Sequence, residues 1–362
     1  MPKVRVVFDA REVTADARYS GIGTFVRELL PALAECDGIE VVALATPDLV
    51  LPPEVGRVAI QRFTRERRRA TIEHVSRVWM DIARARADVF HNPVFHAPIH
   101  FQRRWVQSLH DVIPLVRHDG DLAVLRQRWK RFGSRYRRAD RVVAVSRYTA
   151  DEGIRELGLD PRKVEVIHHG VARSFMPDPR AEPADPPYVV MVSEFSLRKG
   201  FGEAFAVIGE LAEAGYPHRL KIAGRVIPTV RAELEHLVAT APRPDRIDLL
   251  GYVDDLPALV RGATVAIVAS RYEGFGLPAA EAMACGTPLV SFANSALVEV
   301  VGDGGILVTD GDVKEMTAAV RQLLDDDDMR SEFRERGLAQ AASYNWDRAA
   351  AAYADVYRDV VR

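Results

Sequence analysis

A proline-rich stretch, residues 177–187, divides the 362-residue sequence into two halves that share one pattern. Five of its eleven residues are proline, which favours a stiff and extended connector between folded parts. On either side of it, short apolar runs alternate with longer segments in which apolar residues recur at helical spacing. This alternation predicts an α/β fold with a doubly wound parallel sheet in each half.

The predicted strands matter for function because sheets of this kind bind ligands just beyond the carboxyl ends of their strands. In the first half, small and polar residues fall at predicted strand ends: Gly21, Gly23, His91, His110, Ser146 and Gly170. We therefore expect a binding site along this edge of the first sheet.

Composition argues against several classes of protein. No window of 18 or more uninterrupted apolar residues occurs, so we expect no membrane-spanning helix. The first residues run directly into a strand-like segment, Val4–Asp9, without the layout of a signal peptide. Cys36 and Cys285 are far apart and fall in predicted helices, which is typical of core residues in a reducing compartment. We therefore expect a cytoplasmic protein.

The charge is unevenly distributed between the two halves. Residues 1–180 carry 31 Lys and Arg against 23 Asp and Glu, whereas residues 181–362 carry 18 against 28. Basic residues cluster in residues 126–138, which form either a solvated helix face or a surface that attracts a phosphate-bearing acceptor or an anionic membrane. The aromatic residues of this segment recur at core spacing, which argues against nucleic acid as a partner.

The stretch from Glu273 to Glu281 is the strongest candidate site. It follows an apolar run, residues 264–269, that is typical of a buried parallel strand. Gly274 and Gly276 are expected to turn the backbone sharply, which places Glu281 in the first turn of a helix. A helix N-terminus binds anions and carboxylates bind hydroxyls, so the stretch suits a sugar joined to a phosphate. A tight strand–loop–helix turn with a capping Glu is the other interpretation.

Two further motifs are suited to contact such a ligand. Lys199 follows Arg198 in a predicted strand–helix loop, as either a diphosphate clamp or part of a solvated pair. His110 ends an apolar strand beside Asp111, where it is either a donor to a sugar hydroxyl or a hydrogen-bonded structural residue. The histidines do not fall at metal-ligand spacing, so we expect no metal site.

Taken together, these segments resemble the retaining family-4 glycosyltransferases of the GT-B type, and they look most like its bacterial mannosyltransferase-like branch. The resemblance covers nearly the whole chain, and its most specific part is Glu273-Gly-Phe-Gly-Leu-Pro-Ala-Ala-Glu281-Ala. The supporting motifs are Ser20-Gly-Ile-Gly23, His110-Asp-Val-Ile-Pro114, Ala144-Val-Ser146, Val166-Ile-His-His-Gly170, Arg198-Lys-Gly200 and Leu250-Gly-Tyr-Val253.

The resemblance implies two Rossmann-like domains facing across a cleft. Residues 1–176 would form an acceptor-side domain, residues 177–187 a linker, and residues 188–344 a nucleotide-sugar-binding domain. Residues 345–362 would form a helix that crosses back onto the first domain. The implied activity is retaining, metal-independent transfer of a mannose- or glucose-type hexose from GDP-mannose or a UDP-sugar, without a cofactor. The acceptor would be a hydroxyl of a glycan, a lipid-linked molecule or a small molecule, as in polysaccharide or glycolipid biosynthesis.

The resemblance also assigns roles position by position. Glu281 would bond the ribose hydroxyls, while the catalytic set would be His110 and Glu273 at the donor sugar and Lys199 at the diphosphate. The implied donor-binding set is Gly23, Arg198, Lys199, Gly224, Tyr252, Val253, Glu273, Gly274, Phe275, Gly276, Leu277 and Glu281. The implied acceptor-side set is Asn92, Asp111 and Ser146.

One position departs from the pattern. Many relatives carry Arg five residues before the phosphate-binding Lys, where this sequence has Glu194. A carboxylate there would repel a diphosphate unless Arg198 takes over the contact. This position leaves open a catalytically silent nucleotide-sugar-binding protein. A GT-B epimerase that interconverts free sugar nucleotides is a second alternative. Peripheral association of the basic first half with an anionic membrane, at its inner face, is a further expectation.

Overall fold

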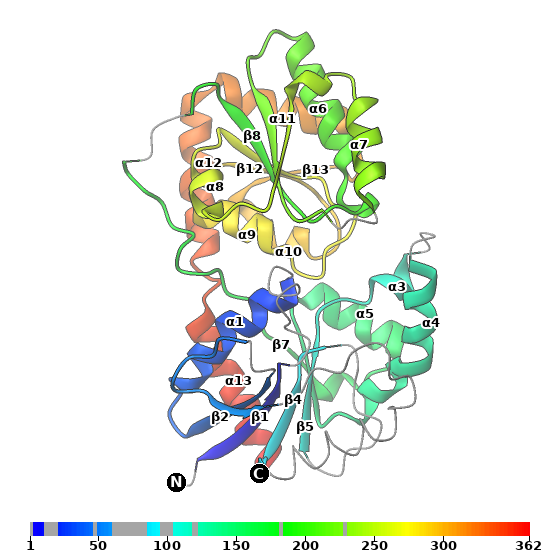
Figure 1. Cartoon of the computed structure of the whole chain (residues 1–362), viewed down its shortest axis with the longest axis vertical. Coiled ribbons are helices and arrows are strands. Elements are labelled where there is room, and N and C mark those ends of the chain that lie inside the picture. Colours follow the sequence, from blue (N-terminus) through cyan, green and yellow to red (C-terminus); the bar gives the residue numbers. More distant parts are fainter. Residues whose placement is uncertain are drawn as a thin grey trace. The chain divides into compact units, whose positions relative to one another are not determined.

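The computed structural model of the chain describes residues 3–10, 21–45, 49–59, 85–94, 104–117, 122–180, 184–226 and 230–362. The chain divides into two compact units. Unit 1 comprises Met1–Gly170 and Asn345–Arg362, and unit 2 comprises Val171–Tyr344. Each unit is built on one parallel sheet with helices on both faces (Figure 1), which confirms the predicted α/β fold class.

The sheet of unit 1 runs in the order β3-β2-β1-β4-β5-β6-β7, with every pair parallel. Its strands are β1 (Val4–Asp9), β2 (Ile39–Ala45), β3 (Gly56–Ala59), β4 (Val89–Asn92), β5 (Arg104–Leu109), β6 (Arg141–Ala144) and β7 (Val164–Val166). The chain moves outward from β1 to β3 and then returns to place β4 on the other side of β1. Doubly wound sheets bind ligands at such a reversal.

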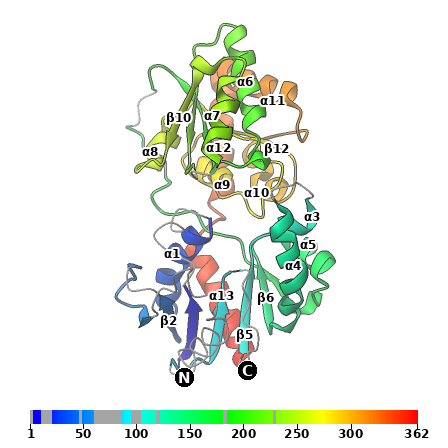
Figure 2. The same cartoon turned by 45° about the vertical axis from the view of Figure 1, so that its right-hand side comes forward.

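Helices cover both faces of this sheet. They are α1 (Gly21–Ala34), α3 (Ile113–Val116), α4 (Ala123–Phe132), α5 (Arg147–Leu157) and α13 (Trp346–Val361), with the 3₁₀ turns η3 (Gly133–Arg138) and η4 (Pro161–Lys163). Successive strand residues point to opposite faces, so Phe8 packs in the core under α1 and α13, and Val7 packs under α4 and α5. In Figure 2, α1 lies on one side of the strands and α4 and α5 lie on the other.

The basic segment, residues 126–138, lies in α4 and η3. Trp129 and Tyr136 are buried with ring centroids 5.4 Å apart, which confirms the core spacing of these two aromatic residues. The side chain of Phe132 lies outside the described part of the chain. Arg126 donates to the carbonyl oxygens of Pro114 and Arg117, so part of the basic charge holds the end of α3.

The last helix of the chain, α13, belongs to unit 1 although unit 2 precedes it in sequence. It buries Trp346, Tyr353 and Tyr357 against α1 and the first sheet. The Tyr357 hydroxyl hydrogen-bonds Nδ1 of the fully buried His91 at 2.5 Å. Both views show α13 beside α1 (Figures 1 and 2).

The sheet of unit 2 runs in the order β10-β9-β8-β11-β12-β13, again with every pair parallel. Its strands are β8 (Tyr188–Val192), β9 (Arg219–Ala223), β10 (Ile247–Gly251), β11 (Val265–Val268), β12 (Leu289–Phe292) and β13 (Ile306–Val308). The chain reverses its direction between β10 and β11, so β8 and β11 lie side by side at the centre. A ligand-binding site is therefore expected at the carboxyl ends of these two strands.

The helices of unit 2 also form two layers. They are α6 (Phe201–Glu213), α7 (Arg231–Ala239), α8 (Leu256–Arg261), α9 (Leu277–Ala284), α10 (Leu297–Val301), α11 (Val313–Asp325) and α12 (Asp327–Ala341), with the 3₁₀ turns η5 (Leu197–Lys199), η7 (Pro244–Arg246) and η8 (Gly302–Gly304). The apolar faces of α6 and α11 pack together on one core, and α9 packs against α12. No helix in the described part of the chain is long and apolar enough to cross a membrane.

Residues 171–176 group with unit 2, although the sequence places them at the end of the first domain. The N–H of Val171 donates to the carbonyl of Tyr344 at 3.0 Å, and Arg261 donates to the carbonyls of Ser174 and Met176. These contacts hold the segment to unit 2. Of the proline-rich stretch, residues 181–183 lie outside the described residues.

Candidate functional site

The loop between β11 and α9 carries the first carboxylate of the candidate site. Gly276 is the residue before α9, with φ at 97°, and a Cβ there would lie 2.8 Å from Cδ2 of Leu297. Only glycine adopts this conformation without strain. The chain bends at Gly274 and Phe275, and Gly276 takes the positive φ directly before the helix, so both glycines lie in the expected sharp turn.

Glu281 lies deeper in α9 than its spacing predicts. The helix begins at Leu277, and its first turn contains no acidic residue. The prediction of a first-turn position is wrong because the backbone becomes helical directly after Gly276. The Glu281 side chain is half-buried on the second turn of the helix.

Lys199 and Glu273 form an ion pair at the centre of the sheet edge. Nζ of Lys199 lies 2.5 Å from Oε1 of Glu273, and the two side chains are only 14% and 12% exposed. Lys199 follows β8 and Glu273 follows β11, which are neighbouring strands. The structure therefore brings together two residues that lie 74 positions apart in sequence.

The environment of Glu273 favours its ionised form. Burial raises the pKa of this carboxyl, but the charge of Lys199, the hydrogen bond from Lys199, the charge of Arg198 and a hydrogen bond from Ser270 together outweigh it and hold the pKa below its usual value. Glu273 therefore has no proton to donate at neutral pH. It can accept hydrogen bonds from hydroxyl groups.

Close backbone approach between two loops makes this pairing possible. Gly200 follows Lys199 with φ at 72°, and a Cβ there would lie 2.0 Å from the carbonyl oxygen of Ala269. The N–H of Arg271 also donates to the carbonyl of Arg198 at 2.8 Å. The loop after β8 is thus held directly against the loop after β11.

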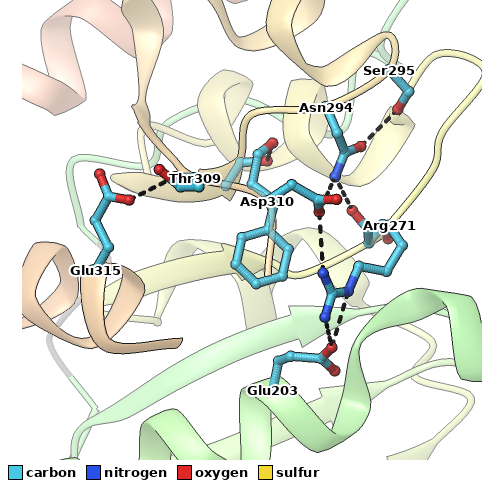
Figure 3. Close-up of polar contacts among 10 residues, drawn as sticks. Glu203, Arg271, Asn294, Ser295, Thr309, Asp310 and Glu315 are labelled. Carbon is cyan, nitrogen blue, oxygen red and sulfur yellow. Dashed lines mark hydrogen bonds and ion pairs between the residues drawn. The ribbon is translucent and has the colours of Figure 1, made fainter. Parts of the chain in front are cut away.

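A second set of polar side chains joins the loops that follow β11, β12 and β13 (Figure 3). Arg271 contacts Glu203 of α6 through Nε and Nη2, at 3.0 and 2.6 Å. Its Nη1 lies 3.6 Å from Asp310, which accepts a hydrogen bond from Asn294 at 2.7 Å. Ser295 accepts a hydrogen bond from the N–H of Glu273 at 2.9 Å. These side chains surround the loop that carries Glu273.

Three further polar residues of this site, Arg271, Asn294 and Ser295, were not expected from the sequence. Arg271 stands two positions before Glu273, where its contacts with Glu203 and Asp310 depend on residues far away in sequence. Asn294 and Ser295 follow β12, and a polar pair at a strand end is the signal that could have identified them. Among the described residues, no group of three or more His, Cys, Asp or Glu side chains is arranged to hold a metal ion.

The remaining donor-set residues of unit 2 lie along the same edge. Gly224 follows β9, and its N–H donates to the carbonyl of Gly251 at 2.8 Å. Tyr252, next to Val253 after β10, is 54% exposed. The side chain of Phe275 is buried against Tyr344, with ring centroids 5.4 Å apart, so it packs inside the unit. Glu194 is exposed in the loop after β8.

In unit 1, His110 lies at the end of β5 among other rings. Its Nε2 is 2.8 Å from the carbonyl of Pro93, so this nitrogen carries the proton and Nδ1 has the lone pair. Burial lowers the pKa of His110 to about 4, against the opposing effect of the Pro93 hydrogen bond. The ring contacts Phe25 edge-on at 4.9 Å and stacks on His169 at 5.5 Å. His110 is therefore neutral at neutral pH.

The three acceptor-side residues have structural contacts. Asn92 is fully buried and donates to the carbonyl of Val94 and to Oε1 of Gln107, both at 2.8 Å. Ser146 is also buried and caps α5 by accepting from the N–H of Thr149. Asp111 accepts from the N–H of Ile113 at the start of α3. Each side chain thus orders a loop at the strand ends.

Gly23 lies within a helix and not in the loop expected from the sequence. The helix α1 spans Gly21–Ala34, so Gly21 and Gly23 belong to its first turn, and Gly23 is buried. Ser20, the first residue of the same motif, lies outside the described residues.

Both halves of the chain match known protein families. The family described as Glycosyltransferase Family 4 matches residues 19–175, and the family described as Glycosyl transferases group 1 matches residues 173–340. O-antigen chain mannosyltransferase B of Escherichia coli is 44% identical over 116 residues, which cover 32% of this chain and 30% of that protein. Matches span 30–60% of the length of the curated relatives compared.

Solved structures share the fold over nearly the whole chain. Sucrose-phosphate synthase from Thermosynechococcus elongatus superposes with a TM-score of 0.84 at 22% identity, covering 99% of both chains. Alr3699/HepE of Anabaena, in complex with UDP-glucose, superposes with a TM-score of 0.75 at 17% identity, covering 98% of this chain and 99% of that one. At these identities the likeness concerns the fold.

Proposed function

Because the chain belongs to the family-4-like glycosyltransferases of the GT-B type, we propose that it transfers a hexose from a nucleotide-diphosphate sugar to an acceptor hydroxyl. The observation that carries this proposal is the largely buried Lys199–Glu273 ion pair beside the N-terminus of α9. It places one cation and one carboxylate where a sugar diphosphate needs each of them.

The donor would lie along the strand ends of unit 2. Lys199 would neutralise the diphosphate, and the N–H groups of Phe275 and Gly276, at the start of α9, would point toward phosphate or sugar oxygens. The ionised carboxylate of Glu273 would accept hydrogen bonds from sugar hydroxyls, and Glu281 would bond the ribose. The protein would then supply positive charge from its own residues, without a metal or a cofactor.

The proposed reaction breaks one bond and forms one bond at the anomeric carbon of the sugar. The acceptor oxygen attacks the anomeric carbon while the bond between this carbon and the diphosphate oxygen breaks. The bonding electron pair leaves with the nucleoside diphosphate, and the acceptor proton passes to the leaving oxygen. Lys199 would stabilise the charge that develops there, by an amount on the order of 3 kcal/mol. His110 would contact the sugar near the reacting carbon.

We favour retention through attack on the face from which the diphosphate leaves. Retention by a double displacement needs a free carboxylate as nucleophile. Glu273 is held by Lys199 and by its main-chain contacts, and its pKa is depressed by that pairing against the effect of burial. It is better suited to orient the sugar than to attack it.

The relatives indicate which donors to test. The Escherichia coli relative is named a mannosyltransferase, and the Anabaena structure contains UDP-glucose. GDP-mannose and UDP-glucose are therefore the proposed donors of first choice.

The surface of α4 supports an acceptor at an anionic membrane. Val124 and Leu125 are 64% and 42% exposed at the start of this helix, and Arg128 and Lys130 are exposed beyond them. Exposed apolar residues next to basic ones favour peripheral binding to anionic lipid. A lipid-linked acceptor is part of the proposal, with a glycan or a small molecule as the other acceptor classes.

A ligand screen followed by two variants tests the proposed function. Thermal shifts with GDP, UDP and ADP and their hexose conjugates should identify the donor, because a ligand at 100 times its Kd stabilises by about 2.7 kcal/mol. Glu273→Ala should abolish transfer and Lys199→Ala should lower it strongly. Full activity in both variants would exclude the proposed site. An epimerised donor, detected by NMR without acceptor, would indicate an epimerase instead.

A further inference from the structure

The main chain of Glu273 is held on both sides by the loop after β12. Its N–H donates to Oγ of Ser295 at 2.9 Å, and its carbonyl accepts from the N–H of Ala296 at 3.3 Å. Three positions earlier, the carbonyl of Ser270 accepts from Nδ2 of Asn294 at 2.9 Å. The position of Glu273 therefore depends on the residues that follow β12.

Ser295 has a left-handed backbone, with φ at 45°. A side chain with a Cβ is strained in this region, and such strain concentrates at functional sites. The conformation directs the hydroxyl toward Glu273, from whose N–H it accepts, while it donates its own proton to Oδ1 of Asn294 at 2.8 Å. Both roles of the hydroxyl are therefore assigned.

Asn294 fixes the direction of that hydroxyl. Its Oδ1 accepts from Ser295, and its two Nδ2 protons go to the Ser270 carbonyl and to Oδ1 of Asp310 at 2.7 Å. Asp310 in turn lies 3.6 Å from Nη1 of Arg271, which stands next to Ser270 in the same loop. The contacts form a closed circuit that joins the loops after β11, β12 and β13 (Figure 3).

We propose that Ser295 is a positioning residue that sets the main chain of Glu273, and with it the carboxylate that faces the donor sugar. The inference rests on the proposed function of the site. The Ser295 hydroxyl contacts the main chain of Glu273 and the side chain of Asn294, whereas the diphosphate contacts are proposed for Lys199 and the start of α9. Its loss should therefore weaken contacts with the sugar more than contacts with the diphosphate. A displacement of a reacting group by about 1 Å can cost on the order of 100-fold in rate.

Two substitutions separate this role from a general effect on folding. Ser295→Ala and Ser295→Gly both remove the hydroxyl, but only glycine also relieves the left-handed strain. We expect Ser295→Gly to melt at a higher temperature than Ser295→Ala. Both variants should nevertheless lose turnover of the nucleotide-hexose by about 10- to 100-fold, because both leave the N–H of Glu273 without its acceptor.

Binding and turnover are measured on the same preparations of the full chain. The probes are GDP, UDP and ADP for binding, and GDP-mannose, UDP-glucose and ADP-glucose for binding and for slow hydrolysis. In hydrolysis, water replaces the acceptor, the anomeric carbon–oxygen bond breaks, and the nucleoside diphosphate leaves with a proton. We expect the Kd of the bare nucleoside diphosphate to change by less than about twofold while kcat falls as above.

Ser343→Ala is the matched control. Its hydroxyl donates to the carbonyl of Gln340 at the end of α12. This variant should bind and turn over the probes as the wild type does. Wild-type turnover in Ser295→Gly, or loss of nucleoside diphosphate binding together with turnover in both Ser295 variants, would overturn the positioning role. If the wild type itself neither binds nor turns over any probe, the proposed function fails first, and the inference fails with it.

Discussion

At the scale of single residues, low exposure decides how much the Lys199–Glu273 pair contributes to the free energy of unfolding. Both side chains are less than 15% exposed, and each satisfies the charge of the other. Breaking a buried pair by removing one partner costs about 3–5 kcal/mol, whereas replacing both partners by uncharged residues of similar size is often nearly neutral. The pair is therefore a strong constraint on substitution at either position alone.

Lys199→Met should lower the free energy of unfolding by about 3 kcal/mol, since Glu273 is left buried without its cation. Adding Glu273→Gln to the same chain should restore most of this loss. Urea unfolding of the two single variants and the double variant at pH 7 measures the difference. Equal losses in the single and double variants would contradict a buried pair.

His110 makes the stability of unit 1 depend on pH, with lower stability at lower pH. Burial lowers the pKa of His110 from 6.5 to about 4, so protons bind more tightly to the unfolded chain than to the folded one. Its contribution to stability is complete above pH 6.5 and is lost as the pH falls through 4. Between pH 7 and pH 5 the loss should be about 2 kcal/mol.

His110→Gln should remove this part of the pH dependence, because glutamine can donate to the Pro93 carbonyl without titrating. Unfolding of the variant and the wild type at pH 7 and pH 5 tests the expectation. His236→Gln, on the exposed side of α7, is the control and should leave the difference between the two pH values unchanged. A wild-type profile as flat as that of His110→Gln would contradict the lowered pKa of His110.

At the scale of elements, the turn into α9 depends on one glycine. Gly276→Ala should destabilise unit 2 by about 1–2 kcal/mol, because alanine is strained at φ 97° and its Cβ would lie 2.8 Å from Leu297. Gly202→Ala in α6 is the matched control, since nothing lies within 4 Å of a Cβ there. The control should be neutral or stabilising by up to about 1 kcal/mol. Urea unfolding compares them, and equal stability of the two variants would count against the strained turn.

The loop between β11 and α9 shows which features of the site the sequence could predict and which it could not. The apolar run and the glycines predicted a strand, a turn and a helix, and all three are present. Which glycine takes a positive φ, and where Glu281 falls on the helix, depend on backbone angles that spacing does not reveal. Ser295 lies 22 residues beyond Glu273, and their contact arises only when β11 and β12 pair. Asn92 and Ser146 were both expected on the acceptor side from the resemblance, but both side chains are fully buried.

At the scale of the whole molecule, unit 1 is built from two separate parts of the chain. A chain that stops after Tyr344 should lose the folded state of unit 1, because α13 supplies Trp346, Tyr353 and Tyr357 to its core. Removing one such side chain costs about 3–5 kcal/mol, and a domain is stable by only about 5–15 kcal/mol. Circular dichroism should then show one unfolding transition fewer than in the full chain. A chain lacking only Arg362 is the control, and unchanged unfolding of the truncated chain would contradict the role of α13.

The position of α13 also sets the order in which the two units can fold during synthesis. The strands of unit 1 leave the ribosome first, but the helix that completes their core is made after all of unit 2. At about 5–20 residues per second, synthesis of the intervening segment takes roughly 10 to 35 s. Throughout that interval the surface that α13 later covers is open to chaperones, while unit 2 has all of its own residues and can finish folding before unit 1.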